Sequence, residues 1–332
     1  MLNLPIFSPP RILIFPLKHI ERHQLLVRSP ATFSIKLTKH KMAAYEFPDF
    51  DQLPSVPGQP QGSLWGFFDR GGKKDELGTI NLLNAETVKE AAREIQTGRH
   101  VQLDWPMNNV EFPGFGRIPI EHNVKEMEKE GFLGLDDEIK INTQTSSQWD
   151  SLKHASLSCG CFLRWWEHKN PGKEAPSAIS TYSIPASELE EVLKFQGTEC
   201  RQGDVLIVRT GFVRWHDLAD ERTRIKGTSP ETKVLTLIGV ESNMDTVRWL
   251  YSKHFSAVAG DTMGWEAWPY PKDCCLHEWL LCQWGTPIGE MWNLEQLSDV
   301  CAELKRWSFF LTSAPLHVVG AVGSPPNVIA IF

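Results

Sequence analysis

Hydrophobic and polar residues follow two different periods along the chain after residue 64, and together they predict a mixed α/β protein. Short runs of apolar and β-branched residues predict strands, at 205–209, 255–259, 308–311 and 328–332. Apolar residues spaced three and four positions apart predict helices, at 187–195, 244–251 and 294–305. Alternating strands and helices favour an α/β fold, but periodicity alone does not choose one α/β architecture.

The clearest helix signal lies between residues 84 and 98. Asn84 is a favoured N-cap residue, and Gly98 is a favoured residue just after a helix. The apolar residues between them share one helix face: Val88, Ala91, Ala92 and Ile95. We therefore expect an amphipathic helix that packs against the core.

Residues 108–135 differ in composition, because they are rich in glycine, proline and charge. This composition indicates either a long loop over the functional site or a disordered insertion. His122 lies in this stretch and is expected to be solvated rather than catalytic.

Three segments are expected along the chain. Residues 1–41 carry seven Lys or Arg and one acidic residue, so they resemble either a mitochondrial presequence or an upstream start before Met42. Four prolines between positions 5 and 16 favour the upstream start, because they would break an amphipathic helix. Residues 42–64 are expected to form an extended arm, since 54–62 are rich in Pro, Gly and Gln. A single domain should then occupy residues 65–332.

Composition narrows the class of protein. A chain of 332 residues, 41% of them hydrophobic, is long enough for one large domain with a real core. The formal charge of −7 argues against a nucleic-acid binder, and no apolar run is long enough to cross a membrane. Seven cysteines without a clear secretory signal are typical of free thiols in a reducing compartment. We expect a cytoplasmic protein, or a mitochondrial one if the presequence is genuine.

Candidate chemistry is concentrated between Gln144 and His154, after an alternation at 138–142 that predicts a strand. Asp150 is a hard anionic ligand or an orienting group, and His154 can exchange a proton near neutral pH. Either residue alone has an ordinary structural explanation, as a turn carboxylate or a core histidine. Together, where a strand ends in a loop, they indicate a hydrolytic site.

This stretch resembles the H-x-G-T-H-x-D-x-P-x-H signature of the cyclase-like metal-dependent hydrolases, a family that includes kynurenine formamidase and isatin hydrolase. Asp150 and His154 fall on its Asp and last His, whereas Gln144 and Gln148 replace its two earlier histidines. His277 and Glu290, in Leu-His-Glu-Trp-Leu-Leu and Gly-Thr-Pro-Ile-Gly-Glu, resemble the second ligand block of the family. The fungal cyclase branch is more similar still, through 148–150, 203–211, 257–261 and 307–315.

The resemblance implies a swivelling β/β/α fold, a homodimer and a metal site. Asp150, His277 and Glu290 would hold one divalent metal, Zn²⁺ or Mn²⁺, with His154 as general acid/base. A second metal is not expected, because neutral amides are poor ligands for Zn²⁺.

Three further residues are expected to contact the substrate, namely Gln144, Gln148 and Trp149. The glutamines would donate or accept hydrogen bonds, and the tryptophan would line a pocket for a flat ring, although tryptophans are also ordinary core residues.

The expected activity is hydrolysis of an amide, formamide or lactone of a small molecule, which could be aromatic. The alternatives are a metal-free cyclase or dehydratase of fungal secondary metabolism, and a binding protein that has lost catalysis. A serine hydrolase is disfavoured because no Gly-x-Ser-x-Gly motif occurs, and a nucleotide-binding enzyme because no phosphate-binding loop occurs.

Overall fold

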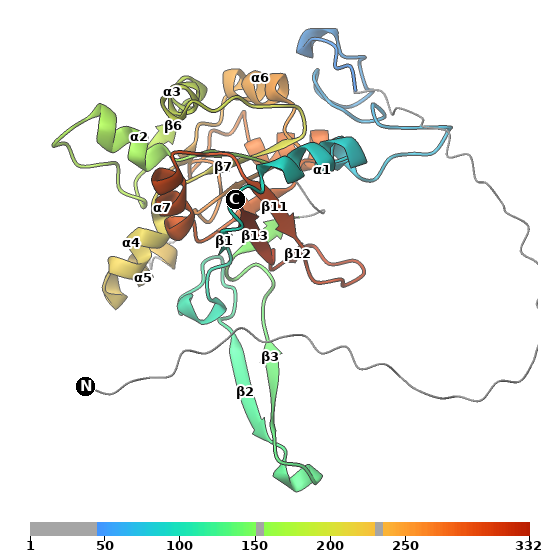
Figure 1. The fold of residues 1–332 in the computed structure, drawn as a ribbon. Coiled ribbons are helices and arrows are strands. Elements are labelled where there is room, and N and C mark those ends of the chain that lie inside the picture. The colour runs from blue at the N-terminus through green and yellow to red at the C-terminus, as the bar shows by residue number, and fades with distance from the viewer. Residues whose placement is uncertain (1–44, 151–155, 230–234) are drawn as a thin grey trace, which may run out of the picture. The chain divides into compact units, whose positions relative to one another are not determined.

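The described domain is built around a six-stranded mixed sheet (Figure 1). The structure is a computed structural model that describes residues 45–150, 156–229 and 235–332. In spatial order the strands are β12 (Gly323–Ser324), β4 (Gln148–Asp150), β10 (Ile288–Glu290), β9 (Ala257–Gly260), β7 (Asp204–Val208) and β5 (Ser156–Gly160). The last four are parallel to one another, and β4 is antiparallel to both of its neighbours.

Both faces of this sheet are covered, and β7 shows why its sequence is continuously apolar. Val205 and Ile207 face a second, antiparallel sheet, and Leu206 and Val208 face a layer of helices. The second sheet has the order β1 (His100–Gln102), β13 (Val328–Ile331) and β11 (Phe310–Ser313). The helices are α2 (Phe162–Lys169), α3 (Ala186–Gln196) and α6 (Met244–Lys253). A strand buried on both faces has no polar side to alternate with, and the resulting sheet, sheet and helix layers agree with the expected β/β/α architecture.

The remaining regular elements are short. The helices are α4 (Phe212–Leu218), α5 (Glu221–Thr228), α7 (Glu295–Leu304), a π-helix (Glu278–Trp284), and 3-10 helices at Phe50–Gln52, Gly78–Leu82, Met107–Asn109 and Glu128–Glu130. Strands β6 (Ser183–Ile184) and β8 (Gly239–Val240) pair in parallel. No helix in the described ranges has the length and apolar character needed to cross a membrane.

The elements with strong periodicity are confirmed, including α3, which ends at Gly197 in the left-handed conformation (φ 63°). The helix expected after Asn84 is also present, as α1 (Ala85–Ala91) followed by a 3-10 turn (Ala92–Glu94). Asn84 caps it by accepting hydrogen bonds from two backbone N–H groups at 2.9 and 3.1 Å. The prediction of its packing face is largely wrong, because Val88, Ala92 and Ile95 are exposed and only Ala91 of the four is buried.

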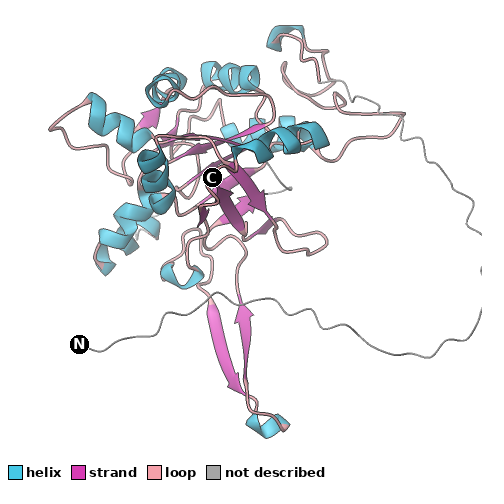
Figure 2. Ribbon diagram, viewed as in Figure 1, coloured by secondary structure: helices cyan, strands magenta, loops and turns pink. Residues whose placement is uncertain are grey.

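The prediction of a long loop at 108–135 is wrong for the second half of that stretch. Strands β2 (Glu121–Glu126) and β3 (Leu135–Lys140) form a hairpin that extends away from the sheets (Figure 2). Every residue of both strands is exposed, so the alternation at 138–142 marks a solvated hairpin strand rather than a core strand. His122 is exposed, as expected, and its Nε2 lies 2.9 Å from Asp137 Oδ2.

The segment before residue 65 packs on the domain from Tyr45 onward, and residues 45–332 form one compact unit. Phe50, Leu53 and Leu64 are buried in the core, where Tyr251 donates its hydroxyl to the Pro48 carbonyl at 2.7 Å. Gly62 has φ 101°, and a Cβ there would lie 2.1 Å from the Phe50 ring, so only glycine fits. The expected extension at 1–41 lies outside the described residues.

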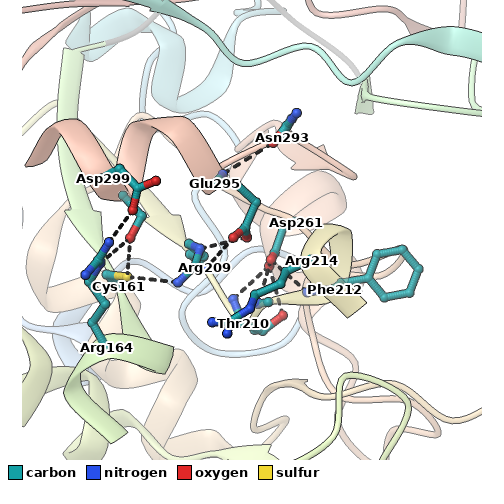
Figure 3. A network of polar contacts seen from close by, with 12 residues as sticks. Cys161, Arg164, Arg209, Thr210, Phe212, Arg214, Asp261, Asn293, Glu295 and Asp299 are labelled. Atoms are coloured by element: carbon teal, nitrogen blue, oxygen red, sulfur yellow. Dashed lines mark hydrogen bonds and ion pairs between the residues drawn. The ribbon is translucent and has the colours of Figure 1, made fainter. Parts of the chain in front are cut away.

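A buried polar network fixes the ends of β7 and β9 beside the starts of α4 and α7 (Figure 3). Asp261, which is fully buried, accepts hydrogen bonds from the backbone N–H groups of Thr210, Gly211 and Phe212 and from the Thr210 hydroxyl, at 2.7 to 2.9 Å. Next to it, Arg209 forms a two-pronged ion pair with Glu295, at 2.9 and 2.6 Å.

We expect Asp261→Asn to lower the free energy of unfolding by about 3 kcal/mol or more, because the amide NH₂ would face backbone N–H donors and leave them unpaired. Asp220→Asn is the matched control, since Asp220 caps α5 at an exposed position and asparagine caps equally well. Urea unfolding of both variants measures the difference, and equal stabilities would contradict the assigned role.

Candidate functional site

Neighbouring strands β4 and β10 bring the site's side chains together. Asp150 pairs with Ile288, and Gln148 pairs with Glu290. Because alternate residues of a strand point to opposite faces, Gln148, Asp150 and Glu290 share one face. Gly289 directly precedes Glu290 on β10. A Cβ there would lie 2.7 Å from both Ala259 and Trp292, so glycine is required for this close packing.

Trp149 points to the other face, into the core between the sheets. Its side chain is 2% exposed, its indole N–H donates to Ser313 Oγ at 2.9 Å, and its ring packs edge-on against Trp292. The structure therefore does not bring Trp149 to the side chains of Asp150 and Glu290.

His277 completes the cluster from the segment immediately before the π-helix. Its Nε2 lies 3.1 Å from Glu290 Oε1. Asp150, His277 and Glu290 each offer one potential ligand atom, and these atoms lie within 4.8 Å of one another. The three residues predicted as metal ligands are thus neighbours in space.

Glu266, which the sequence analysis missed, holds His277 from the opposite side. Its carboxylate is fully buried and lies 2.6 Å from His277 Nδ1. It also accepts hydrogen bonds from the backbone N–H groups of Leu276 and His277, at 2.8 and 3.0 Å, and from the Ser242 hydroxyl. These contacts fix the imidazole ring so that Nε2 faces Glu290.

The electrostatics follow from burial and from the close acids. Burial lowers the pKa of His277, but hydrogen bonds to Glu266 and Glu290 outweigh burial and raise the pKa to about 10. Burial, together with the charge of Asp150, raises the pKa of Glu290 to about 7, although the hydrogen bond to His277 lowers it. Burial likewise raises the pKa of Asp150.

Glu266 and Glu290 both contact His277, but their pKa values move in opposite directions. The pKa of Glu266 is lowered, and the pKa of Glu290 is raised. The distances show which contact dominates. At 2.6 Å Glu266 is the main partner of the imidazolium, and at 3.1 Å Glu290 is the weaker one, in a pocket that it shares with the acid Asp150.

Gln144 and Gln148 donate to the carboxylates of the cluster. Gln144 Nε2 lies 2.6 Å from Asp150 Oδ1, and Gln148 Nε2 lies 2.6 Å from Glu290 Oε2. Gln148 Oε1 is buried and has no hydrogen-bond partner among the described residues. The donor set of one oriented imidazole and two carboxylates fits a Zn²⁺ or Mn²⁺ ion. His154 lies outside the described residues.

Arg117, also missed from the sequence, lies beside this cluster. Its Nη1 donates to the Gln144 carbonyl, and its charge lowers the pKa of both Asp150 and Glu290 against the larger effect of burial. Arg117 belongs to the glycine-rich stretch before the hairpin, where neither periodicity nor spacing marked it.

A cavity of about 720 Å³ lies elsewhere, between α1 and the segments 196–204 and 305–309. It contains none of the candidate ligands, and several of its charged side chains are exposed and paired with each other, such as Lys89 with Glu86 and Arg93 with Glu90. The buried cluster of acids and imidazole is therefore the better candidate for chemistry.

Known proteins resemble this chain in sequence and in fold. A model of the family described as "Putative cyclase" matches residues 96–267, a little over half of the chain. No curated protein matches. A solved structure described as a novel cyclase is 27% identical, with a TM-score of 0.68 over 81% of this chain and 99% of that one.

Two isatin hydrolase structures are also similar in fold. One, bound to the product analogue thioisatinate, is 14% identical, with a TM-score of 0.53 over 75% of this chain and 97% of that one. Isatin hydrolase A from Ralstonia solanacearum is 15% identical, with a TM-score of 0.51 over 79% of this chain and 99% of that one. At these identities the likeness shows a shared fold alone.

The raised pKa values predict how the stability of metal-free protein depends on pH. A group whose pKa is higher in the folded state contributes stability at low pH and loses it as pH rises through the folded value. For Glu290 this loss falls between pH 4.5 and about 7, and for His277 between pH 6.5 and about 10. We therefore expect the free energy of unfolding, measured with urea and a chelator, to fall from pH 5 to pH 10.

His277→Asn is the matched variant, because it removes the imidazole and keeps a polar side chain of similar size. Its stability should depend less on pH than that of the wild type between pH 6.5 and 10. Parallel pH profiles for the two proteins would show that His277 does not hold its proton as the geometry indicates.

Proposed function

The chain belongs to the cyclase family, and from this premise we propose that it is a hydrolase that uses one divalent metal to cleave an amide, formamide or lactone bond of a small molecule. The observation that carries the proposal is the convergence of Asp150, His277 and Glu290, whose ligand atoms lie within 4.8 Å of one another. The fold shared with hydrolases supports the class of reaction by analogy.

The charge balance of the cluster supports a metal. Two largely buried carboxylates raise each other's cost of ionisation, and a divalent cation would relieve that cost. A metal-binding histidine typically donates its second ring N–H to a carboxylate, and Glu266 is placed to accept it at 2.6 Å. Three protein ligands would leave a coordination position open for water.

A metal held there would supply an acidified water and polarise the substrate carbonyl. The residues of this chain would do the rest. Glu266 would keep the His277 ring in place, and Gln144 would orient Asp150. His154, four positions after Asp150, would take the proton that water loses as its oxygen bonds to the carbonyl carbon. It would then deliver that proton to the leaving nitrogen or oxygen as the C–N or C–O bond breaks.

One observation favours the second candidate, a metal-free cyclase or dehydratase. The carboxylates of Asp150 and Glu290 already accept hydrogen bonds from Gln144 and Gln148, and His277 supplies a positive charge beside them. These hydrogen bonds and the imidazolium would stabilise the two acids without a metal ion. Such an enzyme would act through His154 and Asp150 and would be indifferent to chelators.

Metal analysis of purified protein separates the two candidates. We expect about one equivalent of Zn²⁺ or Mn²⁺ in the wild type and little in His277→Ala or Glu290→Gln, because two remaining ligands hold a divalent ion weakly. His154→Ala should keep its metal but lose turnover of formamides, amides or lactones by a factor of roughly a hundred to ten thousand. His122→Ala, which changes an exposed histidine of the hairpin, is the control.

Wild-type protein without metal, whose turnover survives a chelator but not the loss of His154, would overturn the hydrolase and support the metal-free enzyme. Protein that turns over none of these compounds and tolerates His154→Ala would instead support a binding protein.

Glu266 gives a second test, with metal affinity as its readout. Glu266→Gln should weaken binding of Zn²⁺ roughly ten- to a hundredfold in calorimetric titrations, because a neutral amide no longer raises the basicity of His277. Glu188→Gln is the control, since this partly buried acid lies 2.9 Å from a tyrosine hydroxyl outside the cluster. Unchanged affinity in Glu266→Gln, with an intact fold by circular dichroism, would contradict its role.

A further inference from the structure

Arg117 is fixed against the ligand cluster by two contacts. Arg117 is half-buried, and its guanidinium donates to the Gln144 carbonyl. The next residue, Ile118, accepts a hydrogen bond from the Thr145 hydroxyl at 2.7 Å. Because the Gln144 side chain in turn lies 2.6 Å from Asp150, the guanidinium sits one residue away from the candidate metal ligands.

The guanidinium has no acidic partner in the described part of the chain. Arg209, in contrast, is ion-paired with Glu295 at 2.6 Å. Arg117 affects Asp150 and Glu290 through its charge, but neither is ion-paired with it. A guanidinium carries five N–H donors in a planar fork, and the hydrogen bond to Gln144 occupies only one of its nitrogens.

An aromatic wall continues from the guanidinium. The guanidinium carbon lies 5.2 Å from the Phe115 ring centroid, Phe115 meets Trp268 edge-on at 6.1 Å, and Trp268 meets Tyr270 at 4.9 Å. Phe115 is 56% exposed and has φ 59°, a left-handed conformation that bulky residues rarely adopt. Residues in rare backbone conformations cluster at active sites and where ligands are held.

We propose that Arg117 and Phe115 form an anion-binding subsite. It selects substrates in which the cleaved bond is attached to an aromatic ring that also carries a carboxylate. A planar fork binds a carboxylate through two parallel hydrogen bonds, which a lysine or an amide cannot reproduce. The Phe115 and Trp268 rings offer apolar faces to the ring of the same molecule. This inference rests on the proposed function for the identity of the bond, but not for the binding itself.

A matched pair of fluorescent probes tests binding without turnover. 2-Naphthoate and 2-naphthamide share a ring and differ in charge, and their affinities are measured for protein as purified and with a chelator. The chelator arm removes direct binding of the carboxylate to a metal. We expect the wild type to prefer the naphthoate in both arms, and Arg117→Gln to weaken naphthoate binding roughly tenfold or more while leaving the naphthamide unchanged.

Arg70→Gln is the matched control, because Arg70 also lies over an aromatic ring, that of Tyr45 at 4.9 Å, and has no ion-pair partner in the described ranges. It should behave as the wild type. Phe115→Ala should weaken both probes alike, since it removes ring contact and leaves the charge in place. Equal affinities of Arg117→Gln and wild type for the naphthoate would overturn the subsite, as would a preference that disappears with the chelator.

Kinetic measurements then show whether the bound carboxylate belongs to the substrate. With 4-formamidobenzoate and formanilide as substrates, Arg117→Gln should raise KM for the benzoate alone and leave kcat within a few fold. An equal loss for both compounds would mean that Arg117 serves the reaction itself, and the substrate selection would fall. If neither compound is hydrolysed but the naphthoate preference stands, the proposed hydrolysis fails while the anion subsite survives.

Discussion

The buried contact between His277 and Glu266 is the constraint on which the site depends. A charged pair removed from water is stable only if its remaining donors and acceptors are satisfied. Glu266 meets this demand by accepting hydrogen bonds from the Ser242 hydroxyl and from the backbone at Leu276 and His277. These partners come from two separate stretches of chain, and Glu266 itself lies on a third. Satisfying one carboxylate therefore fixes the start of the π-helix and aims the imidazole at Glu290.

The second constraint is the register between β4 and β10. Trp149 fills the core between the sheets, so a slip of one residue would bury Asp150 there and turn the indole toward the site. Gly289 makes the same register compulsory on β10, because no side chain fits between Ala259 and Trp292. The packing that stabilises the sheets thus also places the two acids side by side, and the stability of the fold and the geometry of the site cannot be varied independently.

Elements whose periodicity reflects local burial could be predicted from the sequence. Strand β7 is apolar from Val205 to Val208 because both faces are covered, and α3 ends where Gly197 adopts a left-handed conformation. The β2–β3 hairpin was predicted only in part, through the alternation at 138–142 that overlaps β3. Strand β2 could not be predicted in the same way, since it is solvated and carries no hydrophobic face against a core. The packing of α1 was misjudged because an apolar stripe shows which face could be buried, not whether a neighbour covers it.

The candidate site, like the fold, could be predicted only in part. The grouping of Asp150, His277 and Glu290 was predicted only through the family resemblance, because residues so far apart in sequence have no spacing to connect them. Glu266 left one trace, an acid within the apolar run from Trp265 to Trp268, where a charge must have a partner. Arg117 left none, because its role depends entirely on a tertiary contact with Gln144.

Gln144 and Gln148 show how the cluster differs from the family signature it resembles. A histidine at either position would offer a lone pair to a cation, whereas each glutamine here offers an N–H group to a carboxylate. The amides balance the acids by hydrogen bonding, and Gln148 keeps its buried oxygen unpaired on the other side of the same group. Rotation of that amide by half a turn would exchange its donor for its acceptor at Glu290. The neutral side chains are therefore compatible with two charge states of the cluster, one with a protonated His277 and one with a neutral His277 that binds a divalent ion.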